Sequence, residues 1–140
     1  MEQPTNQYPT LIPKEPVSET SDTIDPCELK DAEPETLAKA VEGFLDAKKG
    51  SDILVLDVAE KTSLTSYFVI CTATSTTHAK ALGDELDFQT SRRGATPIHT
   101  EGRAGGAWVL LDYGPVIVHI FTPDARDFYR IERLYTGGEE

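Results

Sequence analysis

Cysteine is scarce in this chain, and long apolar runs are missing. Cys27 lies in a proline-rich segment and Cys71 in an apolar one, so the two show neither the spacing of a disulfide framework nor that of a metal site. No apolar run approaches the length of about 18 residues that a membrane helix needs. The N-terminus has neither the apolar stretch of a secretory signal nor the arginine-rich, acid-poor composition of an organelle transit peptide. These absences favour a soluble cytoplasmic protein with no membrane contact.

Basic residues are also few, because 13 Lys and Arg stand against 24 Asp and Glu, for a net charge of -11. Coating a phosphate backbone requires clustered Lys and Arg, and Arg92-Arg93 is too small a cluster for that. We therefore expect little direct contact with nucleic acid. A macromolecular partner of this acidic chain should present a basic protein surface.

The composition changes near residue 34. Residues 1–34 hold six of the nine prolines, few large apolar side chains, and eight acids against two lysines. Such a segment buries too little apolar surface to offset the entropy of ordering it. We predict a disordered acidic tail over 1–34 and a single folded domain over 35–140.

Within the domain, periodicity predicts an α/β fold with a mixed sheet of about five strands and three helices. A first amphipathic helix follows Pro34, a second begins at a Ser75 N-cap and closes near Gly94, and a third begins at Thr122. The predicted strands are Ile53–Val58, Tyr67–Ala73, Thr96–Thr100, Trp108–Tyr113 and Val116–Phe121. The strand at 96–100 is expected to return parallel to the one at 67–73, through a right-handed crossover.

The last two strands form a hairpin that turns at Gly114-Pro115 and has two different faces. One face is apolar apart from a phenol and belongs in the core: Val109, Leu111, Tyr113, Val116, Val118 and Ile120. The other face is mixed: Trp108, Leu110, Asp112, Ile117, His119 and Phe121. The diagonal between Asp112 and His119 is short enough for a polar contact. The mixed face is a candidate binding surface.

Five blocks of the sequence, in this order, resemble the ribosomal silencing factor family, RsfS, also called Iojap-like. They are DILVLDV (52–58), SYFVICTATSTTHAKAL (66–82), the Glu101-Gly102 pair, WVLLDYGPVIVHIF (108–121) and ARDFYRIERLY (125–135). The resemblance implies a mixed five-stranded sheet flanked by helices, a nucleotidyltransferase-like α/β sandwich. This chain departs from the family in Leu134-Tyr135, where relatives usually have Leu-Trp.

The resemblance also implies a function that is not enzymatic. Family members bind the large ribosomal subunit through ribosomal protein L-fourteen, at the surface that would meet the small subunit, and so block subunit joining. The outcome is repression of translation when nutrients are scarce, or protection of maturing large subunits.

An enzyme that binds nucleotide and divalent metal is the alternative reading. A nucleotidyltransferase needs a Gly-Ser turn followed by spaced aspartates that hold two metal ions. Here Asp52 and Asp57 flank an apolar strand, and the turn at 72–75 has no aspartate pair behind it. The three histidines lie on different predicted elements, and Ser75 is better explained as a helix cap than as a nucleophile. No catalytic residue, metal or cofactor is expected.

The predicted partner-binding residues are therefore on the mixed hairpin face and beside it. Trp108 and Leu110 would give apolar contact, and Asp112, Glu101 and His119 polar pairing; the weaker candidates are His78 and Tyr113. A homodimer through the same face is an alternative use of it. The last helix should pack Phe128, Ile131, Leu134 and Tyr135 on the sheet and leave its charges to solvent.

Overall fold

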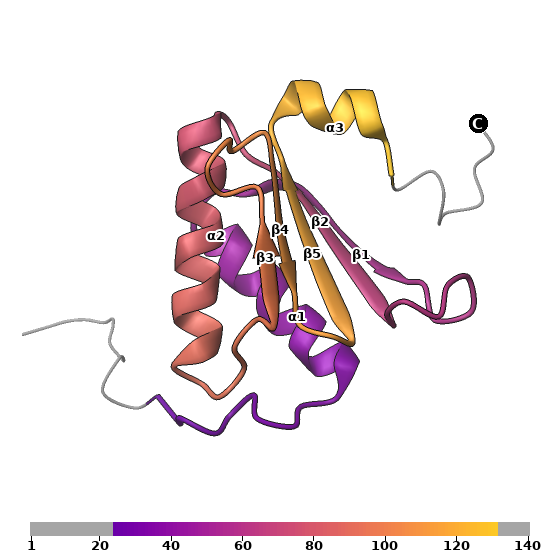
Figure 1. The fold of residues 1–140 in the computed structure, drawn as a ribbon. Coiled ribbons are helices and arrows are strands. Elements are labelled where there is room, and N and C mark those ends of the chain that lie inside the picture. Colours follow the sequence, from indigo (N-terminus) through magenta and orange to yellow (C-terminus); the bar gives the residue numbers. More distant parts are fainter. Residues whose placement is uncertain (1–23, 132–140) are drawn as a thin grey trace, which may run out of the picture.

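The five predicted strands form one mixed sheet, with two helices on one face and a short third helix at one end of the other (Figure 1). The computed structural model describes residues 24–131. The elements in chain order are α1 (Pro34–Ala47), β1 (Ser51–Asp57), β2 (Tyr67–Thr72), α2 (Thr76–Ser91), β3 (His99–Glu101), β4 (Trp108–Asp112), β5 (Val116–Phe121) and α3 (Pro123–Tyr129). The predicted fold class is confirmed, because the protein is α/β and its five-stranded sheet is mixed.

Strand order is β1-β2-β5-β4-β3, and the parallel pair at its centre is β2 with β5. All six residues of β5 are buried. The other neighbouring pairs are antiparallel. The prediction that Thr96–Thr100 pairs parallel with the second strand is wrong: β3 covers only three residues and pairs antiparallel with β4 at the sheet edge. The apolar β5 fits the doubly covered central place, whereas the short polar β3 fits an edge.

The predicted inner face of the hairpin is confirmed. All six residues of this face are buried against the inner sides of α1 and α2: Val109, Leu111, Tyr113, Val116, Val118 and Ile120. A second apolar cluster lies on the opposite face of the sheet, under α3: Val58, Phe68, Ile70, Ile117, Phe121 and Ala125. The sheet is thus apolar on both sides near its centre. The mixed hairpin face contributes Ile117 and Phe121 to the second cluster, and its Trp108 and Leu110 pack against that cluster.

The third helix differs from its prediction at its C-terminal end. Thr122 caps its start as expected, accepting a hydrogen bond from the Ala125 amide at 3.4 Å. The helix stops at Tyr129, because Arg130 adopts a left-handed conformation with φ 48°. Phe128, predicted to pack on the sheet, is 79% exposed, while Ile131 does contact the second cluster. Leu134 and Tyr135 lie outside the described residues.

Arg126 corrects the expectation of a solvated charged face on this helix. Its Nη1 donates to the Asp52 carbonyl at 2.6 Å and to the Thr72 hydroxyl at 2.8 Å. The helix is therefore fastened to the ends of β1 and β2.

Residues 24–33 correct the predicted extent of the disordered tail. Leu29 is 3% exposed and belongs to the main core, and its amide donates to the Arg93 carbonyl at 2.8 Å. Glu28 forms an ion pair with Arg93 at 3.4 Å. The segment runs as a strap between the end of α2 and the start of α1 (Figure 1). The earlier part of the predicted tail lies outside the described residues.

The strap predicts a stability effect for a residue that composition alone assigns to the tail. Replacing the buried Leu29 with Ala should lower the free energy of unfolding by about 2 to 4 kcal/mol, through lost burial and the cavity left behind. Leu64→Ala is the matched control, because Leu64 is 67% exposed and its loss should be close to neutral. Urea unfolding measures the free energy of unfolding of both variants. Equal effects of the two changes would contradict the packing of Leu29 in the core.

Candidate docking face

Side chains from three neighbouring strands meet on the sheet face opposite α1 and α2. Glu101 of β3 pairs with Leu110 of β4, and Leu110 pairs in turn with His119 of β5. Since alternate residues of a strand share a face, Trp108 and Asp112 lie on the same side as Leu110. We call these five residues the Trp108 face. The structure thus brings together five of the seven predicted site residues.

Trp108 is half-buried at the centre of an aromatic cluster. Its ring centroid lies 4.6 Å from that of Tyr129 on α3, 5.0 Å from Phe121 and 5.8 Å from His119. Tilted rings at these separations contribute beyond the area that they bury. These contacts hold the indole against the protein, and Trp108 remains partly accessible at the surface.

His119 holds this indole by a hydrogen bond. The Trp108 Nε1–H donates to His119 Nδ1 at 3.0 Å, so the neutral imidazole carries its proton on Nε2. Burial lowers the pKa of His119 to about 4. The predicted contact between Asp112 and His119 is therefore wrong. His119 is only 6% exposed, which makes it a support for Trp108 and not a surface group.

Asp112 instead closes the hairpin turn. Its Oδ1 accepts a hydrogen bond from the Gly114 amide at 2.8 Å, and Gly114 has the positive φ of 95° that such a turn demands. This charge-assisted hydrogen bond uses the Asp112 carboxylate, which the sequence analysis had expected to pair with His119.

Glu101 lies at the open edge of the face. Its carboxylate is 2.6 Å from His99 Nε2 and both side chains are exposed. With Gly102, Trp108 and Leu110 it lines a pocket of about 210 Å³. This volume is below the roughly 300 to 1,000 Å³ of pockets that hold small-molecule ligands. It suits a single protruding side chain of a partner.

The two weaker candidates lie elsewhere. Tyr113 is buried on the α2 side, where its hydroxyl lies 2.8 Å from that of Thr90, and burial raises the pKa of this phenol. His78 joins two helices: Nδ1 accepts from the Thr74 amide and Nε2 donates to the Lys48 carbonyl, each at 2.9 Å. Both side chains are occupied by structural contacts.

Two aromatic residues lie next to the face: Tyr129, which the sequence reasoning did not single out, and Phe128, which it placed on the sheet. The ring of Tyr129 lies tilted against that of Trp108 and its side chain is 48% exposed, and Phe128 beside it is 79% exposed. Helical spacing could have found Tyr129, since it lies four residues after the buried Ala125 and so shares its side of the helix. Nothing in the sequence marks Arg130 as the end of the helix, so the position of Phe128 could not be predicted.

The described residues contain no group of three or more His, Cys, Asp or Glu side chains that could hold a metal ion. Nor does any helix in residues 24–131 have the length and apolarity to cross a membrane. The fold and its most distinctive surface define a small α/β protein with a half-buried aromatic face whose edge carries the exposed Glu101.

Comparison with known proteins identifies the family. The family model described as "Ribosomal silencing factor during starvation", RsfS, matches residues 31–140. The ribosomal silencing factor RsfS of Haemophilus influenzae is 38% identical over 91 residues, which cover 65% of this chain and 89% of that protein. This chain belongs to the RsfS family, as its sequence blocks indicated.

A solved structure and a more distant relative agree with this assignment. A crystal structure of a protein from Chromobacterium violaceum has a TM-score of 0.73 at 35% identity, covering 77% of this chain and 89% of that one. A mouse protein named "Mitochondrial assembly of ribosomal large subunit protein 1" is 30% identical over 96 residues, which cover 66% of this chain and 42% of that protein.

The buried histidine predicts a specific dependence of stability on pH. Its folded pKa of about 4 lies below the ordinary value of 6.5, so between these pH values the unfolded chain holds a proton that the folded chain does not. The contribution of His119 to the free energy of unfolding should therefore be constant above pH 6.5. It should fall by about 3 kcal/mol as the pH drops towards 4.

Urea unfolding of wild type and His119→Gln at a series of pH values from about 4 to about 7 measures this dependence. The variant should lose the slope. His99→Gln, which removes an exposed imidazole from the same sheet face, should keep it. A wild-type slope in His119→Gln would show that another group is responsible.

Proposed function

We propose that this protein is a cytoplasmic ribosomal silencing factor that docks its Trp108 face on ribosomal protein L-fourteen of the large subunit and so blocks joining of the small subunit. The observation that carries the proposal is the half-buried Trp108, held by His119 beside a pocket with an acidic rim, in a chain of the RsfS family. The protein acts by occupying a surface and catalyses no reaction.

The form of the face supports a protein partner. A half-buried tryptophan that is anchored by neighbouring rings, with polar groups around it, has the arrangement of residues that dominate binding energy in interfaces. Tyr129 and Phe128 extend the apolar area from α3, and Leu110 extends it along β4. The centre of the contact would be aromatic and its rim acidic.

The charge of the face supports a basic partner. Glu101 borders the pocket, so a lysine or arginine side chain that enters could lay its aliphatic stem on Leu110 and pair its charge with the carboxylate. The net charge of -11 adds long-range attraction towards a basic protein. Such attraction raises the association rate and falls with ionic strength, whereas the buried aromatic contact sets the lifetime.

The name of the mouse relative supports a large-subunit partner, because it places that protein in assembly of the large ribosomal subunit. A factor seated on the joining surface acts by excluded volume alone and needs no conformational change. The same occupancy serves repression under starvation and protection of maturing large subunits, so one binding event accounts for both.

Loss of the central aromatic should weaken docking most. Trp108→Ala should cost about 2 kcal/mol or more of binding free energy, a loss of roughly 30-fold in affinity. Co-sedimentation with purified large subunits measures binding, and light scattering with both subunits present measures joining. Wild-type protein should reduce joining and Trp108→Ala should not.

Reversal of one rim charge should act mainly on the association rate. Glu101→Lys places a like charge against a basic partner and should bind more slowly, with a weaker dependence on salt. Glu42→Lys on the exposed side of α1 is the matched control, since it changes net charge equally on the other face of the sheet. Equal effects of the two reversals would remove the docking assignment of the Trp108 face.

The alternative uses of the fold have separate outcomes in the same experiments. If the Trp108 face made a homodimer, Trp108→Ala would become monomeric; a variant that keeps its oligomeric state and loses subunit binding excludes this. Nucleotide turnover dependent on divalent metal would indicate an enzyme and contradict the proposal.

A further inference from the structure

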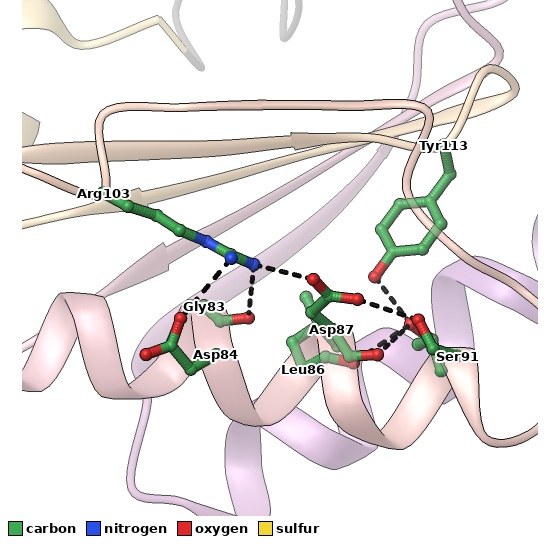
Figure 2. Close-up of polar contacts among 8 residues, drawn as sticks. Gly83, Asp84, Leu86, Asp87, Ser91, Arg103 and Tyr113 are labelled. Atoms are coloured by element: carbon green, nitrogen blue, oxygen red, sulfur yellow. Dashed lines mark hydrogen bonds and ion pairs between the residues drawn. The ribbon is translucent and has the colours of Figure 1, made fainter.

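The loop between β3 and β4 is fastened to α2, on the far side of the sheet from the Trp108 face. Arg103 of this loop places Nη2 3.0 Å from Asp87 Oδ2 and Nη1 3.5 Å from Asp84 Oδ1. Nη2 also lies 3.4 Å from the Gly83 carbonyl, to which it donates. Figure 2 shows the arginine lying along the helix with both carboxylates turned towards its guanidinium group.

The surface of α2 is shaped to receive this arginine. A Cβ added at Gly83 would lie only 3.0 Å from Val109 Cγ1, so the missing side chain lets β4 approach the helix, and Arg103 Nε would lie at an ordinary contact distance of 3.9 Å from it. Asp87 is itself held, because its Oδ1 accepts a hydrogen bond from the Ser91 hydroxyl at 2.8 Å (Figure 2). The acceptor is therefore oriented before the arginine reaches it.

Gly102 connects the contacts of Arg103 with the docking pocket. This residue, adjacent to Arg103, lies so close to the Trp108 carbonyl that a Cβ there would overlap the oxygen. The Gly106 amide closes the loop by donating to the Gly102 carbonyl at 2.8 Å. Gly102 and Trp108 are both walls of the pocket. A shift of Arg103 away from α2 would therefore move the rim of the pocket.

Stability alone does not explain the contact. The Arg103 side chain is 34% exposed, and those of its partners Asp87 and Asp84 are 32% and 69% exposed. Ion pairs this accessible to water contribute little to folding. Arg103 Nε is buried and has no hydrogen-bond partner among the described residues, which is a cost. Such a group is better suited to fixing one arrangement of the loop than to stabilising the fold.

We propose that Arg103 is a positioning residue: by pinning the loop 102–107 to Asp84 and Asp87 of α2, it holds Gly102 and Trp108 in the arrangement that the partner recognises. The inference rests on the proposed function for its binding consequence, and on the fold alone for its effect on Trp108. It assigns to α2 a part in docking, although this helix lies on the opposite face of the sheet.

The effect on Trp108 can be measured without the ribosome. The single tryptophan gives one indole N–H signal in a ¹⁵N-labelled sample, and this hydrogen is the one bonded to His119. Arg103→Met should shift the signal and speed its exchange with solvent by about fivefold, while the unfolding midpoint changes little. Arg92→Met removes the same charge from the end of α2 and should leave the signal unchanged.

Asp87→Asn is the second variant, and it should reproduce the effect of Arg103→Met from the helix side. If the arginine variant does not fold, Asp87→Asn decides alone. The exchanged pair, Arg103→Asp with Asp87→Arg, should restore part of the wild-type signal. Wild-type indole exchange in Arg103→Met or, where that variant does not fold, in Asp87→Asn overturns the inference.

Large-subunit binding gives the second readout. Arg103→Met and Asp87→Asn should each weaken binding, by about fivefold for Arg103→Met, and the double variant should bind no more weakly than Arg103→Met alone, because both changes act on the same attachment of the loop to α2. If wild type itself does not bind, the proposed function fails and the indole measurement still decides the role of Arg103. If wild type binds and both single variants bind as tightly as wild type, the positioning role fails and the proposed function stands.

Discussion

The parallel pairing of β2 with β5 is the constraint on which the rest of the molecule depends. These strands are nearly continuous apolar runs, and each is covered on both faces, by α1 and α2 on one side and by the cluster under α3 on the other. Strands of this kind are stable only at the centre of a covered sheet. Their antiparallel partners, β1 and β4, must then lie outside them, and β3 must lie at the edge. The position of the Trp108 face follows from this order, because the face lies on β3, β4 and β5 beside α3, whose Tyr129 contacts Trp108.

The sequence predicted well wherever a pattern has a single physical solution. The alternation of Val109, Leu111 and Val118 with polar or mixed neighbours admits one burial pattern, and the core face of the hairpin was predicted correctly. On the other face, Ile117, His119 and Phe121 are buried as well, which alternation alone does not show. The caps at Ser75 and Thr122 were likewise readable, since a side-chain oxygen at a helix start has one preferred use. In the same way, the face that carries Trp108 could be located from the residues alone.

Predictions failed where two solutions were close in energy. His119 lies opposite Leu110, so Trp108 and Asp112 are both its diagonal neighbours, and the sequence cannot choose between them. Burial decides: a neutral indole N–H loses less on leaving water than a carboxylate does, and Asp112 finds an amide of the turn instead. The place of Leu29 in the core and the contact of Arg103 with α2 depend on segments distant in sequence, for which no local pattern exists.

Trp108 is the only tryptophan in the chain, and it lies at the centre of the face assigned to docking. Ultraviolet emission of this protein, excited where tyrosine does not absorb, therefore comes from one surface and from one side chain. The polarity around an indole governs the colour of its emission, so water excluded by an arriving molecule changes the spectrum directly. The molecule thus contains its own unlabelled optical sensor for whatever covers that surface.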